Sequence, residues 1–170
     1  MKTLVLAMGN PILRDDGVGH RVADVLEELL DGSGVAIEKT TLAGLNLLDL
    51  LVGFDRTIIV DAIQTGGEPG QVYHLRPSDF VARHTFPHLH NIDFFRTLSL
   101  GKQLLPGLPE EVRVVAIEAG NITNFGEGFT PEVEKAVPVA VRYVLSILEE
   151  ERKNSDPKEP ALSSQEEGHA

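Results

Sequence analysis

The architecture can be read from one stretch, TLVLAMGNPILRDDGVGHRVADVLEELL (residues 3–30). Residues 3–8 form a short apolar run, which predicts a buried strand ending at the Gly9-Asn10-Pro11 turn. Apolar residues then recur at helical spacing from Val18 to Leu30, which predicts an amphipathic helix closed by Gly32 and Gly34. A buried strand that leads directly into a helix is typical of α/β proteins with a parallel sheet.

The rest of the chain continues this alternation. Further strands are expected at 35–39, 57–61 and 112–117, and helices at 44–52, 92–103 and 131–151, the last kinked or interrupted at Pro138. Only nine residues separate Asp61 from the strand-like run 71–76. A parallel crossover needs more, so 71–76 is expected to be an antiparallel neighbour of 57–61, reached by a hairpin. The predicted fold is an α/β layered sandwich, with a mostly parallel twisted sheet of about five strands, one of them antiparallel, and helices on both faces.

Length and composition exclude several classes of protein. A chain of 170 residues with 42% hydrophobic residues predicts one domain, residues 1–151, followed by a disordered acidic tail, residues 152–170. The absence of cysteine removes disulfides and thiolate chemistry. A net charge of −11 argues against nucleic acid or a membrane as partner. Because no apolar run suits a membrane span or a signal peptide, a soluble cytoplasmic protein is expected.

The loop between the first strand and the first helix contains two adjacent acids, Asp15 and Asp16. Glycine-rich loops in this position often hold phosphates, but neither the dinucleotide pattern nor the P-loop pattern is present. Two carboxylates repel a polyanion and attract a cation. The alternative interpretation is structural, since a single acid stabilises a helix N-terminus by about 0.3–1 kcal/mol.

Other candidate ligands lie further along the chain. Asp61 ends an apolar strand, where a carboxylate is costly to bury unless it is paired, hydrogen-bonded or bound to metal. Its alternative role is to cap the following turn. His84, His88 and His90 form a cluster, although loop histidines are more often surface residues. Two carboxylates and one imidazole would suit a divalent first-row metal such as nickel or zinc and leave coordination positions open.

Read together, these segments resemble the nickel–iron hydrogenase maturation endopeptidases. The stretch GNPILRDDGVG (residues 9–19) is similar to the family's opening pattern, and IVDA (59–62) to its second motif. PGQV (69–72), HNIDF (90–94) and GFTPEV (128–133) resemble later family segments in the same order, so that the likeness covers about residues 3–148. The segment EKTTLAG (38–44) departs from the family, which often has an acid and a Gly-Gly turn there.

The resemblance implies a function and a set of site residues. The protein would remove the C-terminal extension of a hydrogenase large-subunit precursor after nickel insertion. Nickel would be carried by the substrate, and Asp16, Asp61 and His90 would bind it and act as the catalytic set, with Pro87-His88 as the alternative source of the histidine. Asp15 would orient Asp16 or cap the helix. A monomer or weak oligomer is expected, and another divalent metal could occupy the site in isolation.

The chemistry and three other functions stay open from the sequence alone. The metal could polarise the scissile carbonyl or activate a water molecule, or a carboxylate could serve as general base. One alternative function is a self-contained metallohydrolase that uses the same three ligands. Another is a non-catalytic chaperone that docks nickel on the precursor, and a third is an unrelated peptidase of similar fold, such as the spore-germination type.

Overall fold

The computed structural model describes the backbone of residues 1–76, 78–79 and 90–155, and the side chains of these residues except 90–96 and 151–155. Five strands form one sheet in the order β2-β1-β3-β5-β4. The first four in this order are parallel, and β4 is antiparallel to β5. This confirms the predicted sheet, whose strands are β1 (Thr3–Met8), β2 (Ala36–Thr40), β3 (Arg56–Ile63), β4 (Val72–Leu75) and β5 (Glu111–Glu118).

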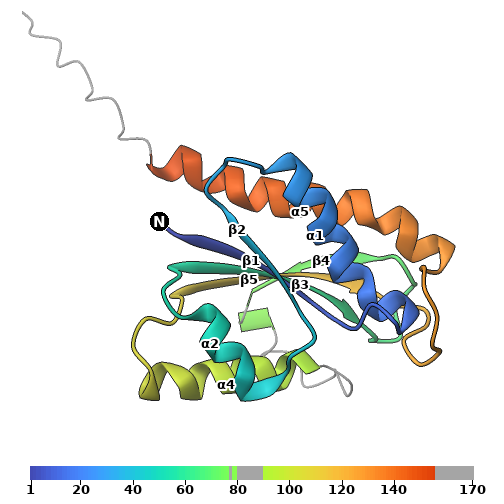
Figure 1. Ribbon diagram of the computed structural model, residues 1–170, viewed down its shortest axis with the longest axis horizontal. Coiled ribbons are helices and arrows are strands. Elements are labelled where there is room, and N and C mark those ends of the chain that lie inside the picture. Colours follow the sequence, from blue (N-terminus) through green and yellow to red (C-terminus); the bar gives the residue numbers. More distant parts are fainter. Residues whose placement is uncertain (77, 80–89, 156–170) are drawn as a thin grey trace, which may run out of the picture.

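Helices cover both faces of the sheet, as predicted (Figure 1). One face carries α1 (Val18–Leu29) and α5 (Pro131–Ser155), and the opposite face carries α2 (Leu48–Leu51) and α4 (His90–Leu104). Two short 3-10 helices, η1 (Arg14–Gly17) and η2 (Gly44–Leu47), lie directly before α1 and α2. The helix predicted at 44–52 is therefore two shorter elements, η2 and α2.

The alternation of side chains along the central strands divides the core into two clusters. Ile58 and Val60 pack with α1 and α5, whereas Ile59 and Ile63 pack with α2 and α4. Neighbouring side chains of a strand point to opposite faces. Both faces are buried, which explains why β1 and β3 are almost continuously apolar.

The pairing of the antiparallel strand differs from the prediction. β4 was expected beside β3 through a hairpin, but it pairs with β5, Val72 lying opposite Ile117 and Leu75 opposite Val114. β5 occupies the position next to β3 and pairs with it along eight residues, from Arg56 to Ile63. The chain therefore crosses beyond the position of β5 to form the edge strand. The local spacing that excludes a parallel crossover cannot show that a later strand will be inserted.

The C-terminal helix is longer than expected. α5 continues from Pro131 to Ser155 without the interruption predicted at Pro138, which lies inside it. The predicted tail beyond Ser155 lies outside the described residues. Among the described helices, none is both long and apolar enough to cross a bilayer.

The strand order creates one special position in the sheet. The chain moves from β1 outwards to β2 on one side and then returns to place β3 on the other side of β1. The connections that leave β1 and β3 therefore diverge. In open α/β sheets, ligands bind in the crevice beyond the carboxyl ends of the strands at such a switch point.

Candidate functional site

Glycines allow the connection after β1 to pack closely at this switch point. Gly9 has a φ of 128°, and a Cβ atom there would collide with the carbonyl oxygen of Asp16. A Cβ atom on Gly19 would lie 2.5 Å from the carbonyl oxygen of Met8 and 2.6 Å from that of Val60. The start of α1 therefore sits directly on the ends of β1 and β3. Close packing therefore accounts for Gly9 and Gly19 of the GNPILRDDGVG stretch.

Asp16 lies in η1 and closes the loop that carries it. Its Oδ2 accepts a hydrogen bond from the backbone N–H of Asn10 at 2.8 Å. Within the described part of the chain, its Oδ1 accepts none. Asp16 is partly exposed, and η1 contacts β3, the strand that carries Asp61. One oxygen thus fixes the carboxylate, while the other is available to a ligand.

Asp15 has a different role, although it is the next residue. Its side chain is completely buried. Its Oδ2 accepts hydrogen bonds from the backbone N–H groups of Gly120 at 2.9 Å and Asn121 at 2.8 Å, and from the hydroxyl of Thr130 at 2.9 Å. Its Oδ1 accepts one from the backbone N–H of Thr130 at 2.7 Å. Asp15 therefore ties η1 to the connection between β5 and α5 and holds Asp16 in position.

Asp61 lies on β3, two residues before the strand ends, and is 6% exposed. Its Oδ1 accepts a hydrogen bond from the backbone N–H of Ala62 at 2.8 Å. Because Ile59 and Ile63 pack on the face of α2 and α4, alternation places the Asp61 side chain on that same face. It therefore faces the layer that contains α4.

The predicted histidines are only partly covered by the structure. His90 is the first residue of α4, so the expected helix begins at the expected ligand, two residues earlier than the predicted helix start. The side chain of His90 lies outside the described set, as do His84 and His88 altogether. Among the described side chains, no three acids or histidines form a group that could hold a metal ion. The complete set of Asp16, Asp61 and His90 therefore stays a prediction.

A further buried acid, Glu118, was not singled out in the sequence. It is 1% exposed, and its Oε1 and Oε2 accept hydrogen bonds from the backbone N–H and the hydroxyl of Thr65, both at 2.7 Å. The hydroxyl of Tyr73 donates a longer one, at 3.4 Å. Glu118 therefore fixes the connection that follows β3. The signal was available, because Glu118 ends an apolar strand much as Asp61 does.

Comparison with known proteins gives a consistent result. The family model described as "Hydrogenase maturation protease" matches residues 21–147. The chain is 30% identical to the hydrogenase 2 maturation protease of Escherichia coli strain K12, with 94% of this chain and 98% of that protein covered. It is 27% identical to a hydrogenase expression/formation protein HupD from Rhizobium leguminosarum, over 86% of this chain and 74% of that one.

Solved structures give the same picture. The hydrogenase maturating endopeptidase HybD from E. coli superposes with a TM-score of 0.73 at 28% identity, covering 89% of this chain and 94% of that one. A [NiFe] hydrogenase maturation protease HybD from Thermococcus kodakarensis superposes with a TM-score of 0.68 at 25% identity, covering 86% and 99%.

Proposed function

The chain belongs to the hydrogenase maturation protease family, and from this premise we propose that it removes the C-terminal extension of a [NiFe]-hydrogenase large-subunit precursor that already carries nickel. Membership makes the protein a peptidase. The large-subunit substrate, the requirement for nickel and the residues that recognise it are the proposal.

One observation supports it most strongly. The short helix η1, which carries the partly free carboxylate of Asp16, contacts β3, the strand that carries Asp61. Two acids from segments 45 residues apart thus lie at the switch point, where an α/β sheet binds its ligand. Among the described residues, no hydrogen bond to Asp16 Oδ1 gives this oxygen a structural role.

The donor chemistry fits a divalent metal that arrives with the substrate. Carboxylate oxygens and one imidazole form an incomplete coordination set, which leaves positions for ligands that the precursor itself provides. The placement of Asp61 on the face of α4 agrees with a contribution from His90 at the start of that helix. Asp16, Asp61 and His90 would together bind the nickel of the precursor and so hold the scissile peptide beside it.

Hydrolysis then needs only water. The water oxygen bonds to the scissile carbonyl carbon, the C–N bond breaks, and the leaving amine takes a proton. The nickel of the substrate can polarise the carbonyl or the water. The alternative is that the free oxygen of Asp16 takes the proton from the water as general base. Either route requires both carboxylates to be ionised and correctly placed.

The decisive experiment compares variants of two acids, one on β3 and one directly before it. Asp61→Asn retains an oxygen that can accept the hydrogen bond from Ala62, so the fold should persist, while processing of the nickel-loaded precursor falls by about 100-fold or more. Asp55→Asn, an exposed acid directly before β3, is the matched control and should process normally. Intact mass measurement of the precursor, with and without nickel, reports loss of the extension.

The other outcomes each identify a different function. Normal cleavage by Asp61→Asn would refute the assignment of the site. An unchanged precursor mass in a stable complex with the wild-type protein would indicate a chaperone. Zinc or manganese bound stoichiometrically, with activity on unrelated peptides, would indicate a self-contained metallohydrolase.

The choice of histidine needs its own pair of variants. His90→Ala should abolish processing, whereas His88→Ala should retain it, because the apolar spacing of the family's third motif continues from His90. The opposite result would transfer the ligand role to His88.

A further inference from the structure

Arg14, the residue before the two acids, adopts an unusual backbone conformation. Its φ is 45°, and among the described residues it is the one non-glycine residue with a positive φ. Such a conformation is costly for a residue with a Cβ atom and is found preferentially at functional sites. The backbone N–H of Arg14 donates to the carbonyl of Gly126 at 3.1 Å, which holds the residue in place.

The side chain of Arg14 has no partner within the described part of the chain. Its Nε is buried and makes no hydrogen bond there, and the guanidinium makes no ion pair. The side chain lies against Gly126, where a Cβ atom would be 3.3 Å from Nε. A guanidinium without a partner among the described residues is notable in a protein with a net charge of −11, since acids are plentiful.

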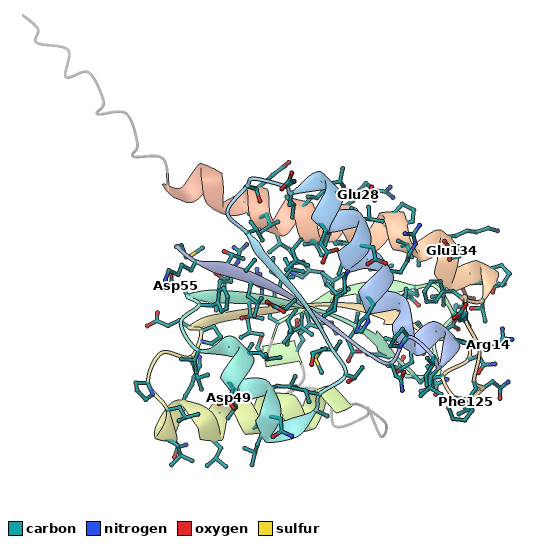
Figure 2. All side chains as sticks on the ribbon, in the orientation of Figure 1. Arg14, Glu28, Asp49, Asp55, Phe125 and Glu134 are labelled. Carbon is teal, nitrogen blue, oxygen red and sulfur yellow. The ribbon has the colours of Figure 1, made fainter. Side chains whose placement is uncertain are left out.

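Two exposed apolar side chains lie on the segments that hold Arg14. Ile12 is 53% exposed and Phe125 is 78% exposed. Their segments are joined by a bridge between Leu13 and Gly126 and by a hydrogen bond from the Gly126 N–H to the carbonyl of Ile12 at 2.9 Å. Figure 2 shows Arg14 and Phe125 at the same end of the molecule, on the side where α1 and α5 begin.

We propose that Arg14 binds a carboxylate of the precursor's C-terminal extension, with Ile12 and Phe125 contacting apolar side chains next to it. A guanidinium presents a planar fork of donors that matches a carboxylate with two hydrogen bonds. This proposal rests on the proposed function. In the proposed function the retained part of the precursor carries the metal to Asp16 and Asp61. The segment beyond the scissile bond would then lie against Arg14, at the start of η1, and against Ile12 and Phe125.

The main test is Arg14→Gly, assayed on the nickel-loaded precursor. Glycine adopts a φ of 45° without strain, so the unfolding midpoint should be equal to or higher than that of the wild type. Loss of a charged hydrogen-bonded contact should raise KM by about tenfold or more, with kcat changed less than about twofold. Arg14→Lys, which keeps the charge but not the fork, should lie between the two.

A control removes the same charge elsewhere. Arg142 is exposed on α5, and Arg142→Gln should leave KM unchanged. Phe125→Ser should raise KM less than Arg14→Gly does and should not lower the unfolding midpoint, because the ring is exposed.

Changes in the precursor identify which carboxylate is bound. Replacing the acids of the extension by amides removes side-chain carboxylates, whereas adding Gly-Gly after the last residue moves the terminal carboxylate. The change that touches the bound carboxylate should raise KM of the wild type and leave KM of Arg14→Gly unaffected.

Two results would overturn the subsite. One is an equal KM for Arg14→Gly and wild type, and the other is an Arg14 effect that persists with the amide-bearing and lengthened precursor. Failure of the wild-type protein to cleave any nickel-loaded precursor is a separate result, which refutes the proposed function itself.

Discussion

The parallel strands begin at one side of the sheet, called here the amino edge, and end at the other, called the carboxyl edge. The acids Asp55 and Asp15 lie in different environments at these two edges. At the amino edge, Asp55 is exposed and its Oδ2 accepts a hydrogen bond from the backbone N–H of Lys2 at 2.6 Å. At the carboxyl edge, Asp15 is completely buried and accepts four hydrogen bonds from a segment more than 100 residues away. Figure 2 shows Asp55 at one end of the sheet and Arg14, the neighbour of Asp15, at the other.

The difference shows where substitution of an acid should cost the most stability. An exposed acid bonded to the residue before a neighbouring strand adds little stability, because water replaces the bond when it is lost. The buried acid Asp15 joins the connection after β1 to the connection after β5, so its loss should change the geometry of both. At the carboxyl edge, Asp15 provides the support, and the adjacent Asp16 is the proposed metal ligand.

The largest effect is expected from removing the buried support. Asp15→Ala leaves the N–H groups of Gly120, Asn121 and Thr130 without their acceptor, so the free energy of unfolding should fall by about 3 kcal/mol or more. Asp55→Ala, at the amino edge, should lower it by less than about 1 kcal/mol. Urea unfolding of both variants measures the difference. Equal losses would show that the two edges do not differ in this way.

The next effect concerns the glycines of the two edges. Gly19→Ala places a methyl group against the carbonyl oxygens of Met8 and Val60, which should cost about 2 kcal/mol of stability. Gly32 lies after α1 in open space with a φ of 72°, so Gly32→Ala should cost about 1 kcal/mol through backbone strain alone. Processing should fall in the first variant and not in the second. A milder effect at Gly19 than at Gly32 would contradict the close packing of α1 on the strand ends.

The smallest effect is expected from a histidine in the middle of a strand, through the pH dependence of stability. His74 is in the middle of β4, opposite Val115, and burial, the main cause, together with nearby Arg113, lowers its pKa from 6.5. The folded state therefore disfavours the protonated ring, so this contribution to stability is present above pH 6.5 and is lost as pH falls through the lowered pKa. His74→Phe should lose less stability than the wild type between about pH 7.5 and pH 5. Parallel pH profiles of unfolding would contradict a lowered pKa.

Much of the fold followed from local patterns in the sequence. The apolar runs of β1, β3 and β5 and the helical spacing of α1 and α5 are properties of neighbouring residues, and the sheet type follows from their alternation. The partner of β4 could not be predicted in this way, because β5 is inserted from a later part of the chain. The last helix was predicted with a kink or a break at Pro138. The break is absent, since packing of the helix on the sheet outweighs the lost hydrogen bond.

The site could be predicted only as far as residue type and strand position allow. Asp61 was selected because a carboxylate is costly at the end of a buried strand, and Asp16 because two adjacent acids in a strand-to-helix loop attract a cation. In the structure Asp16 lies in η1, after β1, and Asp61 lies near the end of β3. The division of roles between Asp15 and Asp16 depends on Gly120, Asn121 and Thr130, which no local pattern connects with them. The left-handed backbone of Arg14 is equally invisible in the sequence.

The insertion of β5 between β3 and β4 has a consequence for synthesis of the chain on the ribosome. Asp16 and Asp61 are made early, but the groups that bind Asp15 are added only after Gly120 has emerged. A nascent chain that ends before that residue contains both acids of the proposed metal site but lacks the groups that tie η1 to the connection between β5 and α5. The proposed site is therefore complete only when translation has passed β5 and reached the start of α5.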